Sequence, residues 1–258
     1  MAGRGSTMPM RMGMLAVLWF GCGAGTAEPE PVEVTQAPAP RLSESAPRRH
    51  CAIAPTPAVA APTADVDVIA NIVVRSAAEA RVTIDRHTPP GNDPDALFAV
   101  AHAETDLYRL EGDAQVLQSA IRHWAQLVQA APTYAQMDQV LYQLAWGLGA
   151  IDQHDRARQV YHRLIQHYPQ SALIVVAYIH FGDHFLRERD GVAATRFYER
   201  AKEMTPEDDV LTHAYLAYGH AWATSVSGDA VEPEPLERAL DAANEPLRAA
   251  IETDWCAR

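Results

Sequence analysis

Residues 139–169 read QVLYQLAWGLGAIDQHDRARQVYHRLIQHYP, and the pattern of this stretch returns along the chain. It closes on Pro169, and Pro132 and Pro206 stand 37 residues away on either side. The positions that keep the same step are Ala120, Ala157 and Ala194; Trp124, Tyr161 and Tyr198; Leu127, Leu164 and Ala201; Leu107, Leu144, Phe181 and Tyr218. A fixed period between about 20 and 50 residues indicates an array of structural repeats.

Each unit is expected to fold as two amphipathic helices. In the quoted unit the first spans residues 139–151 and the second spans residues 156–167, on either side of a short turn. Leu141, Leu144 and Leu148 recur at three- and four-residue steps, so they share one face of the first helix. The proline that closes each unit cannot continue a helix. The sequence therefore predicts an all-α fold of about four stacked helix pairs.

Small residues mark the places where neighbouring helices are expected to approach closely. Ala145, Gly182 and Gly219 keep the 37-residue step, and none of them carries a bulky side chain. Tyr161 and Tyr198 are expected to fill the space beside them.

This pattern resembles the tetratricopeptide repeat. The matching positions of the second unit are Leu144, Ala145, Leu148, Ala157, Tyr161, Leu164 and Pro169. Those of the third unit are Phe181, Gly182, Phe185, Ala194, Tyr198, Ala201 and Pro206. The usual repeat has about 34 residues, so each unit here carries about three more. The resemblance covers roughly residues 95–225, and it implies an α-solenoid that binds other proteins rather than a catalyst.

The two ends of the array depart from the pattern. In the first unit Tyr108 stands where a small residue belongs. In the fourth unit Pro235 falls on the expected aromatic position of the second helix, and Pro246 interrupts the remaining residues. Residues 235–254 are therefore predicted to form an irregular cap that closes a repeat domain of residues 95–258, because the end of a solenoid needs a polar cover.

The resemblance also implies a binding face. In tetratricopeptide arrays the first helix of each pair lines a concave groove. The side chains that would face this groove are Tyr142, Gln143 and Trp146 in the second unit, Ile179, Asp183 and Arg187 in the third, and His213, Leu216 and His220 in the fourth. Tyrosine and tryptophan beside arginine are typical of binding hot spots. The alternative is that Tyr142 and Trp146 pack between helices.

Residues 1–27 have the pattern of a secretory signal. Arg4 and Arg11 precede a short apolar run at residues 12–20, and small residues come directly after it. A bilayer span needs about 20 apolar residues, so this run is too short to be one. Cys22 follows Gly21 in a setting that resembles the bacterial lipoprotein box, which implies acylation of Cys22. The alternative is cleavage near Ala27 and secretion without a lipid.

Two further segments separate the signal from the repeats. Residues 28–64 contain eight prolines, which interrupt both helix and sheet, so a disordered tether is expected there. Residues 65–94 are predicted to form a lead-in helix and a loop. The helix would use the apolar run that starts at Val66, for which a short strand is the alternative. Asp93 before Pro94 is a typical helix start.

The sequence contains few of the motifs that are typical of catalytic or metal sites. His180 and His184 lie one helical turn apart, but the H-E-x-x-H motif is absent, so a metal site is not predicted. No nucleophile elbow, phosphate loop or dinucleotide fingerprint is present, and no cofactor is expected. Cys51 and Cys256 could form a disulfide in an oxidising compartment, although the sequence does not establish that they are close.

Composition narrows the class of partner. The formal net charge is −12, which repels phosphate backbones, so nucleic acid is an unfavourable partner. Together with the signal and the tether, the repeats resemble the tetratricopeptide lipoproteins of Gram-negative envelopes, such as those of the β-barrel assembly and Tol–Pal systems. This resemblance implies a periplasm-facing scaffold, anchored to the outer membrane by lipid, with envelope proteins as partners. The alternatives are a metal binder or enzyme that uses the histidine-rich helix faces, and a subunit that self-associates.

Overall fold

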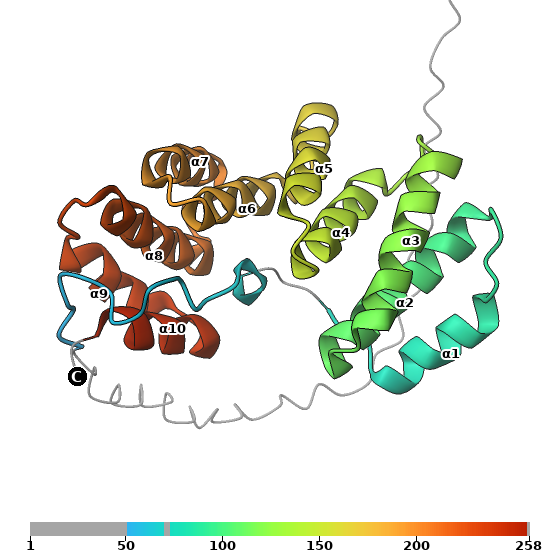
Figure 1. The fold of residues 1–258 in the computed structure, drawn as a ribbon, viewed down its shortest axis with the longest axis horizontal. Coiled ribbons are helices and arrows are strands. Elements are labelled where there is room, and N and C mark those ends of the chain that lie inside the picture. The colour runs from blue at the N-terminus through green and yellow to red at the C-terminus, as the bar shows by residue number, and fades with distance from the viewer. Residues whose placement is uncertain (1–50, 70–72, 257–258) are drawn as a thin grey trace, which may run out of the picture. The chain divides into compact units, whose positions relative to one another are not determined.

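The fold is all-helical in a computed structural model that describes residues 51–69 and 73–256 (Figure 1). The α-helices of this part are α1 (Ala77–His87), α2 (Pro94–Glu111), α3 (Ala114–Ala130), α4 (Met137–Ala150), α5 (His154–His167), α6 (Ile174–Arg187), α7 (Gly191–Met204), α8 (Val210–Ser227), α9 (Pro233–Ala242) and α10 (Glu245–Trp255). In the same described ranges, the 3₁₀ turn η1 (Val66–Val68) precedes them. Within the described ranges no helix has the length and hydrophobicity to cross a bilayer. The predicted signal, Cys22 and the first part of the tether lie outside the described residues.

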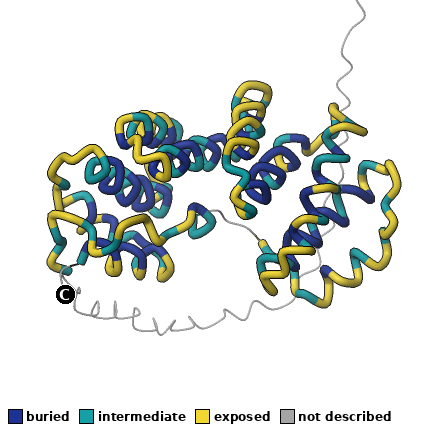
Figure 2. The backbone as a smooth tube through the Cα atoms, in the orientation of Figure 1, coloured by how far each residue is buried: buried dark blue, intermediate teal, exposed yellow. Residues whose placement is uncertain are grey.

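Four helix pairs follow one another in chain order. We call α2, α4, α6 and α8 the A helices, and α3, α5, α7 and α9 the B helices. Each helix packs on the next in sequence from α1 to α10. The A helices carry more of the buried residues than the B helices do (Figure 2). The predicted all-α solenoid is confirmed.

A residue with a left-handed backbone conformation lies at the end of each A helix or in the turn that follows it. These residues are Gly112, Asp152, Arg189 and Gly228, with φ of 73°, 61°, 61° and 85°. After Arg189, the Asp190 N–H donates to the Phe185 carbonyl at 2.9 Å, which is the bond of a Schellman cap. The turn between the paired helices is therefore a local feature that repeats with the array.

Tyr198 sets the close approach of α6 and α8. Its fully buried ring lies between Gly182 and Gly219. A Cβ on Gly219 would stand 2.8 Å from Tyr198 Cζ, and one on Gly182 would be closer still. The prediction that glycines at the 37-residue step leave room for Tyr198 is confirmed.

The C-terminal end is more regular than expected. In place of an irregular cap, residues 233–255 form the helices α9 and α10. Pro233, Pro235 and Pro246 all lie in the first turn of a helix, where the missing proline N–H has no intrahelical partner to lose. The prediction of an irregular cap over residues 235–254 is therefore wrong, because it treated Pro235 and Pro246 as helix breakers.

The lead-in segment is helical over only part of its length. Helix α1 begins after Ser76, which forms a capping box with Glu79. Among the described apolar residues before it, Val66 and Val68 lie in the short turn η1 instead. Asp93 does cap α2, since its side chain accepts from the Asp95 N–H at 3.1 Å.

Residues 51–69, which we call the strap, lie against α6, α8 and α10 (blue in Figure 1). Cys51 and Cys256 form a disulfide with their Cα atoms 5.5 Å apart. Next to it, the Ala54 N–H donates to the Trp255 carbonyl at 2.6 Å. Ile53 and Val66 pack on the apolar cluster of the C-terminal helices. The prediction of a disordered tether is thus wrong over residues 51–64. The disulfide, the hydrogen bond and the apolar packing offset the conformational entropy that this segment loses when it is ordered.

Candidate functional site

The strap crosses the A helices, and the surface that it contacts on α2, α4, α6 and α8 is called the A-helix face. Val66 lies at the centre of this contact and is fully buried. It shares an apolar cluster with Ile179 of α6 and Tyr215 of α8. Full burial of a valine side chain stabilises a fold by on the order of 2 kcal/mol, so Val66 contributes to holding the strap on this face.

A buried carboxylate holds the strap at Thr63. Asp254 of α10 is fully buried and accepts from Thr63 twice, at 3.1 Å from the backbone N–H and 2.9 Å from Oγ1. It also accepts from the Tyr218 hydroxyl at 2.6 Å and from Trp222 Nε1 at 3.2 Å. The Tyr218 hydroxyl in turn accepts from the Thr63 N–H at 2.8 Å. This network binds both the hydroxyl and the backbone N–H of one residue of the strap.

A second polar network holds the strap at Asp67. Trp146 Nε1 donates to Asp67 Oδ2 at 2.9 Å, and Arg109 Nε lies 3.8 Å from the same oxygen. The Arg109 guanidinium also lies 3.8 Å above the Trp146 ring, a cation–π contact. Burial raises the pKa of Asp67 to about 6, while Arg109 acts in the opposite direction. Trp146 and Arg109 thus form a site that binds the Asp67 carboxylate.

Between these two networks lies Asp183 of α6. Its carboxylate accepts from the Tyr198 hydroxyl at 2.6 Å and from the Tyr215 hydroxyl at 3.1 Å. Burial raises its pKa to about 6, and both hydrogen bonds oppose that shift. Asp183 therefore joins the third and fourth units beneath the strap.

Two cavities flank the strap at Asp65. The first, of about 310 Å³, lies between Asp65 and the helices α4, α5 and α6. The second, of about 350 Å³, lies between residues 60–65 and the helices α6 and α8. Arg187 lines both. In the first cavity, Tyr161 Oη and His180 Nε2 are buried and have no hydrogen-bond partner among the described residues.

The predicted groove residues of the second and third units gather under or beside the strap. Tyr142, Trp146 and Ile179 are buried, and Trp146 is both packed between helices and bonded to the strap. Asp183 and Arg187 both line the cavity of about 350 Å³. Gln143 is partly buried, and its side-chain oxygen accepts from Arg109 at 3.4 Å.

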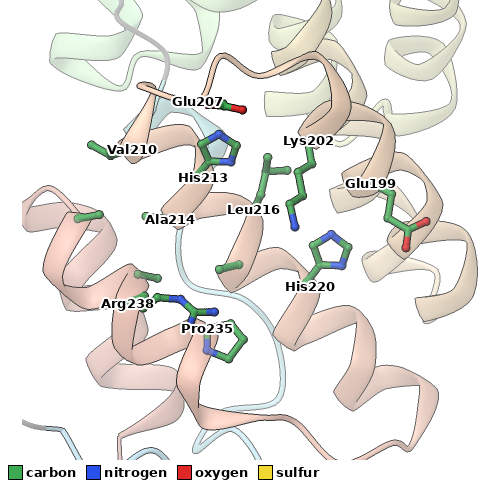
Figure 3. Close-up of a pocket in the computed structure, with 13 residues that line it drawn as sticks. Glu199, Lys202, Glu207, Val210, His213, Ala214, Leu216, His220, Pro235 and Arg238 are labelled. Atoms are coloured by element: carbon green, nitrogen blue, oxygen red, sulfur yellow. The ribbon is translucent and has the colours of Figure 1, made fainter.

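The predicted groove residues of the fourth unit lie elsewhere. His213, Leu216 and His220 line a separate cavity of about 550 Å³ between α7, α8 and α9 (Figure 3). Of the described residues around this cavity, none belongs to the strap. The structure therefore does not bring them together in one cavity with the predicted groove residues of the third unit. The strap contacts α8 through the Tyr218 hydroxyl, which accepts from the Thr63 N–H, and through the apolar cluster that Val66 shares with Tyr215.

The two histidines of α6 are not brought together as a pair. His180 stacks on Tyr161 with ring centroids 4.6 Å apart. His184 instead joins Asp155 and Glu188, and one ligand atom from each lies within 4.8 Å of the others. Both carboxylates are exposed.

Sequence reasoning missed Asp254, Tyr218 and Arg109 as residues of this site. Tyr218 keeps the 37-residue step, which marks it only as a repeat position. Asp254 lies outside the repeats, and no periodic neighbour distinguishes it from other acidic residues. The sequence signal that could have identified Arg109 is its position one repeat before Trp146, since the two residues are 37 positions apart.

Comparison with protein-family models agrees with the repeat architecture. A tetratricopeptide-repeat family model matches residues 139–171, which cover the pair α4 and α5. No curated protein sequence matches the chain. A solved structure described as the crystal structure of MamA protein is similar at 15% identity and a TM-score of 0.40, over 64% of this chain and 91% of that chain.

Proposed function

We propose that this protein is a protein–protein interaction scaffold of a bacterial cell envelope, and that its A-helix face holds an extended segment of a partner. The observation that carries the proposal is the strap, which occupies this face through backbone, hydroxyl, apolar and carboxylate contacts. A face that binds one extended segment in this way has the chemistry to bind another. Its buried aromatic residues and arginine are also typical of binding hot spots.

The envelope location is supported by sequence and by one covalent bond. Residues 1–27 have the pattern of a secretory signal, and Cys22 fits an acylation site. The disulfide between Cys51 and Cys256 is a bond that persists in oxidising compartments. We infer that the mature protein is lipid-anchored and faces the periplasm.

Palmitate labelling tests the anchor. The wild-type protein should incorporate labelled palmitate, and Cys22→Ser should not. Mass spectrometry of the mature protein provides the second reading. A mature chain that carries an unmodified Cys22, or that begins after Ala27, would contradict the lipid anchor.

Photocrosslinking in living cells tests the binding face. A photoreactive residue at Arg187, which is exposed and lines both cavities, should crosslink to a discrete envelope protein. The matched control is Arg163, an exposed residue of the B helix α5. Crosslinking that is equal at both positions, or absent at Arg187, would rule out this face as the partner site.

A further inference from the structure

The strap shows which chemistry the A-helix face selects. Thr63 satisfies Asp254 with both a backbone N–H and a hydroxyl. Val66 fills an apolar site completely, and Asp67 meets Trp146 and Arg109. The recognised segment is Thr-Ala-Asp-Val-Asp-Val, residues 63–68, in which a hydroxyl residue precedes an aliphatic residue flanked by carboxylates.

The strap does not use everything that this face offers. Beside Asp65 the cavity of about 310 Å³ contains two buried polar atoms, Tyr161 Oη and His180 Nε2, that lack a partner in the described part of the chain. Arg158 and Arg187 also line it. A buried polar group without a hydrogen bond is unfavourable, so a ligand that reaches these atoms gains free energy that the strap does not. A longer acidic side chain at the position of Asp65 fits that description, since cationic and hydrogen-bonding groups surround the space.

The strap has a compensating advantage because it belongs to the same chain. The disulfide fixes Cys51 to α10, and Thr63 lies only 12 residues further along. A segment held this close competes at an effective concentration on the order of millimolar. Any partner segment binds only to the fraction of molecules whose strap has left, which reduces its apparent affinity by that fraction.

We propose that residues 63–68 are an internal competitor, and that the partner displaces them with a segment of the same chemistry: a hydroxyl residue, then an aliphatic residue between two acidic ones, the first of which is longer than aspartate. This inference rests on the proposed function, since it names the partner class for the same face. A partner segment therefore binds only if its affinity for the A-helix face is high enough to displace the strap.

A labelled synthetic peptide of residues 60–69 provides the direct test, with binding to the purified full-length protein followed by fluorescence anisotropy. In the variant Asp67→Arg the strap places a cation against Arg109, while the A-helix face is unchanged. We expect this variant to bind the peptide about tenfold more tightly than wild type. Asp85→Arg makes the same charge change at an exposed position of α1 and should behave as wild type.

Changes in the peptide then test the chemistry on the strap-released variant. Replacing Asp65 by Glu in the peptide should tighten binding, and replacing Asp67 by Asn or Val66 by Ser should weaken it. Circular dichroism and thermal melting establish that each protein variant is folded. If Asp67→Arg does not fold, Thr63→Val removes the hydroxyl contact with Asp254 at nearly constant size and should give a smaller increase in the same direction.

Two results would overturn the inference. One is a folded strap variant that binds no peptide, and the other is equal binding of the parent peptide and a scrambled one. The fate of the proposed function is separate, because crosslinking from Arg187 reports on it without any peptide. A specific crosslink with no peptide binding would retain the scaffold and reject this partner class. Peptide binding without a crosslink would show that the strap can be displaced but would reject the scaffold, and with it the partner class that rests on it.

Discussion

Tyr198 shows how one side chain fixes the distance between two helices. Its ring occupies the space that two glycines leave open, and its hydroxyl bonds to Asp183. The ring is therefore held on both faces and at its tip. A methyl group added on either side has nowhere to go, since protein interiors have few voids.

Gly182→Ala should lower the free energy of unfolding by about 1–3 kcal/mol, because the new Cβ collides with the Tyr198 ring. Chemical denaturation measures the change. Gly149→Ala in α4 is the matched control, since a Cβ there meets nothing within 4 Å. The control should gain up to about 1 kcal/mol from the higher helix propensity of alanine. A loss of stability in both variants would show that close packing is not the cause.

His180 should make the fold sensitive to acid. Burial lowers its pKa to about 3, from 6.5 in the unfolded chain. As the pH falls the unfolded chain binds the proton first, so the contribution of His180 to stability is complete above pH 6.5 and is lost from there toward pH 3. His180→Phe keeps a ring against Tyr161 and removes the titration. The difference in unfolding free energy between about pH 7 and pH 5 should be smaller in the variant than in wild type, and an equal difference would contradict this account.

At the scale of helices, the repeat positions were predictable and the ends were not. The 37-residue step placed α4 to α8 because helix packing needs the same small and large residues in every unit. The sequence around the prolines of α9 and α10 does not distinguish a proline in the first turn of a helix from one that ends a helix. The strap could not be predicted for a different reason. Its contacts depend on Asp254 and on a disulfide with a residue about 200 positions away, and a local sequence pattern does not indicate such distant contacts.

Arg189 offers a test of the turn between paired helices. It is a non-glycine residue at φ 61°, where an L-residue is strained. Arg189→Gly should raise the free energy of unfolding by about 0.5–1 kcal/mol, because glycine adopts this conformation without steric cost. Arg189→Ala keeps the strain and should give no such gain. Thermal melting of the two variants separates the effect of the backbone from the loss of the arginine side chain.

On the scale of the whole molecule, the bond between Cys51 and Cys256 joins positions 205 residues apart. Closing so long a loop restricts the unfolded chain strongly. Reduction, or the variant Cys51→Ser, should therefore lower the free energy of unfolding by about 2–4 kcal/mol. Guanidinium denaturation with and without a reductant measures this. Reductant should have no further effect on Cys51→Ser, and a wild-type protein insensitive to reductant would contradict a stabilising role for the bond.

The disulfide also determines where mechanical load enters the domain. Tension along the chain ahead of Cys51, such as a membrane anchor would transmit, passes across the sulfur–sulfur bond into Cys256 at the end of α10. Cys51 thus stays joined to the end of α10, so the bond and not the strap alone transmits this tension to the domain. Pulling on the anchor does not peel the strap from the A-helix face while the bond is intact. Only after reduction would the strap become the first element to bear the force.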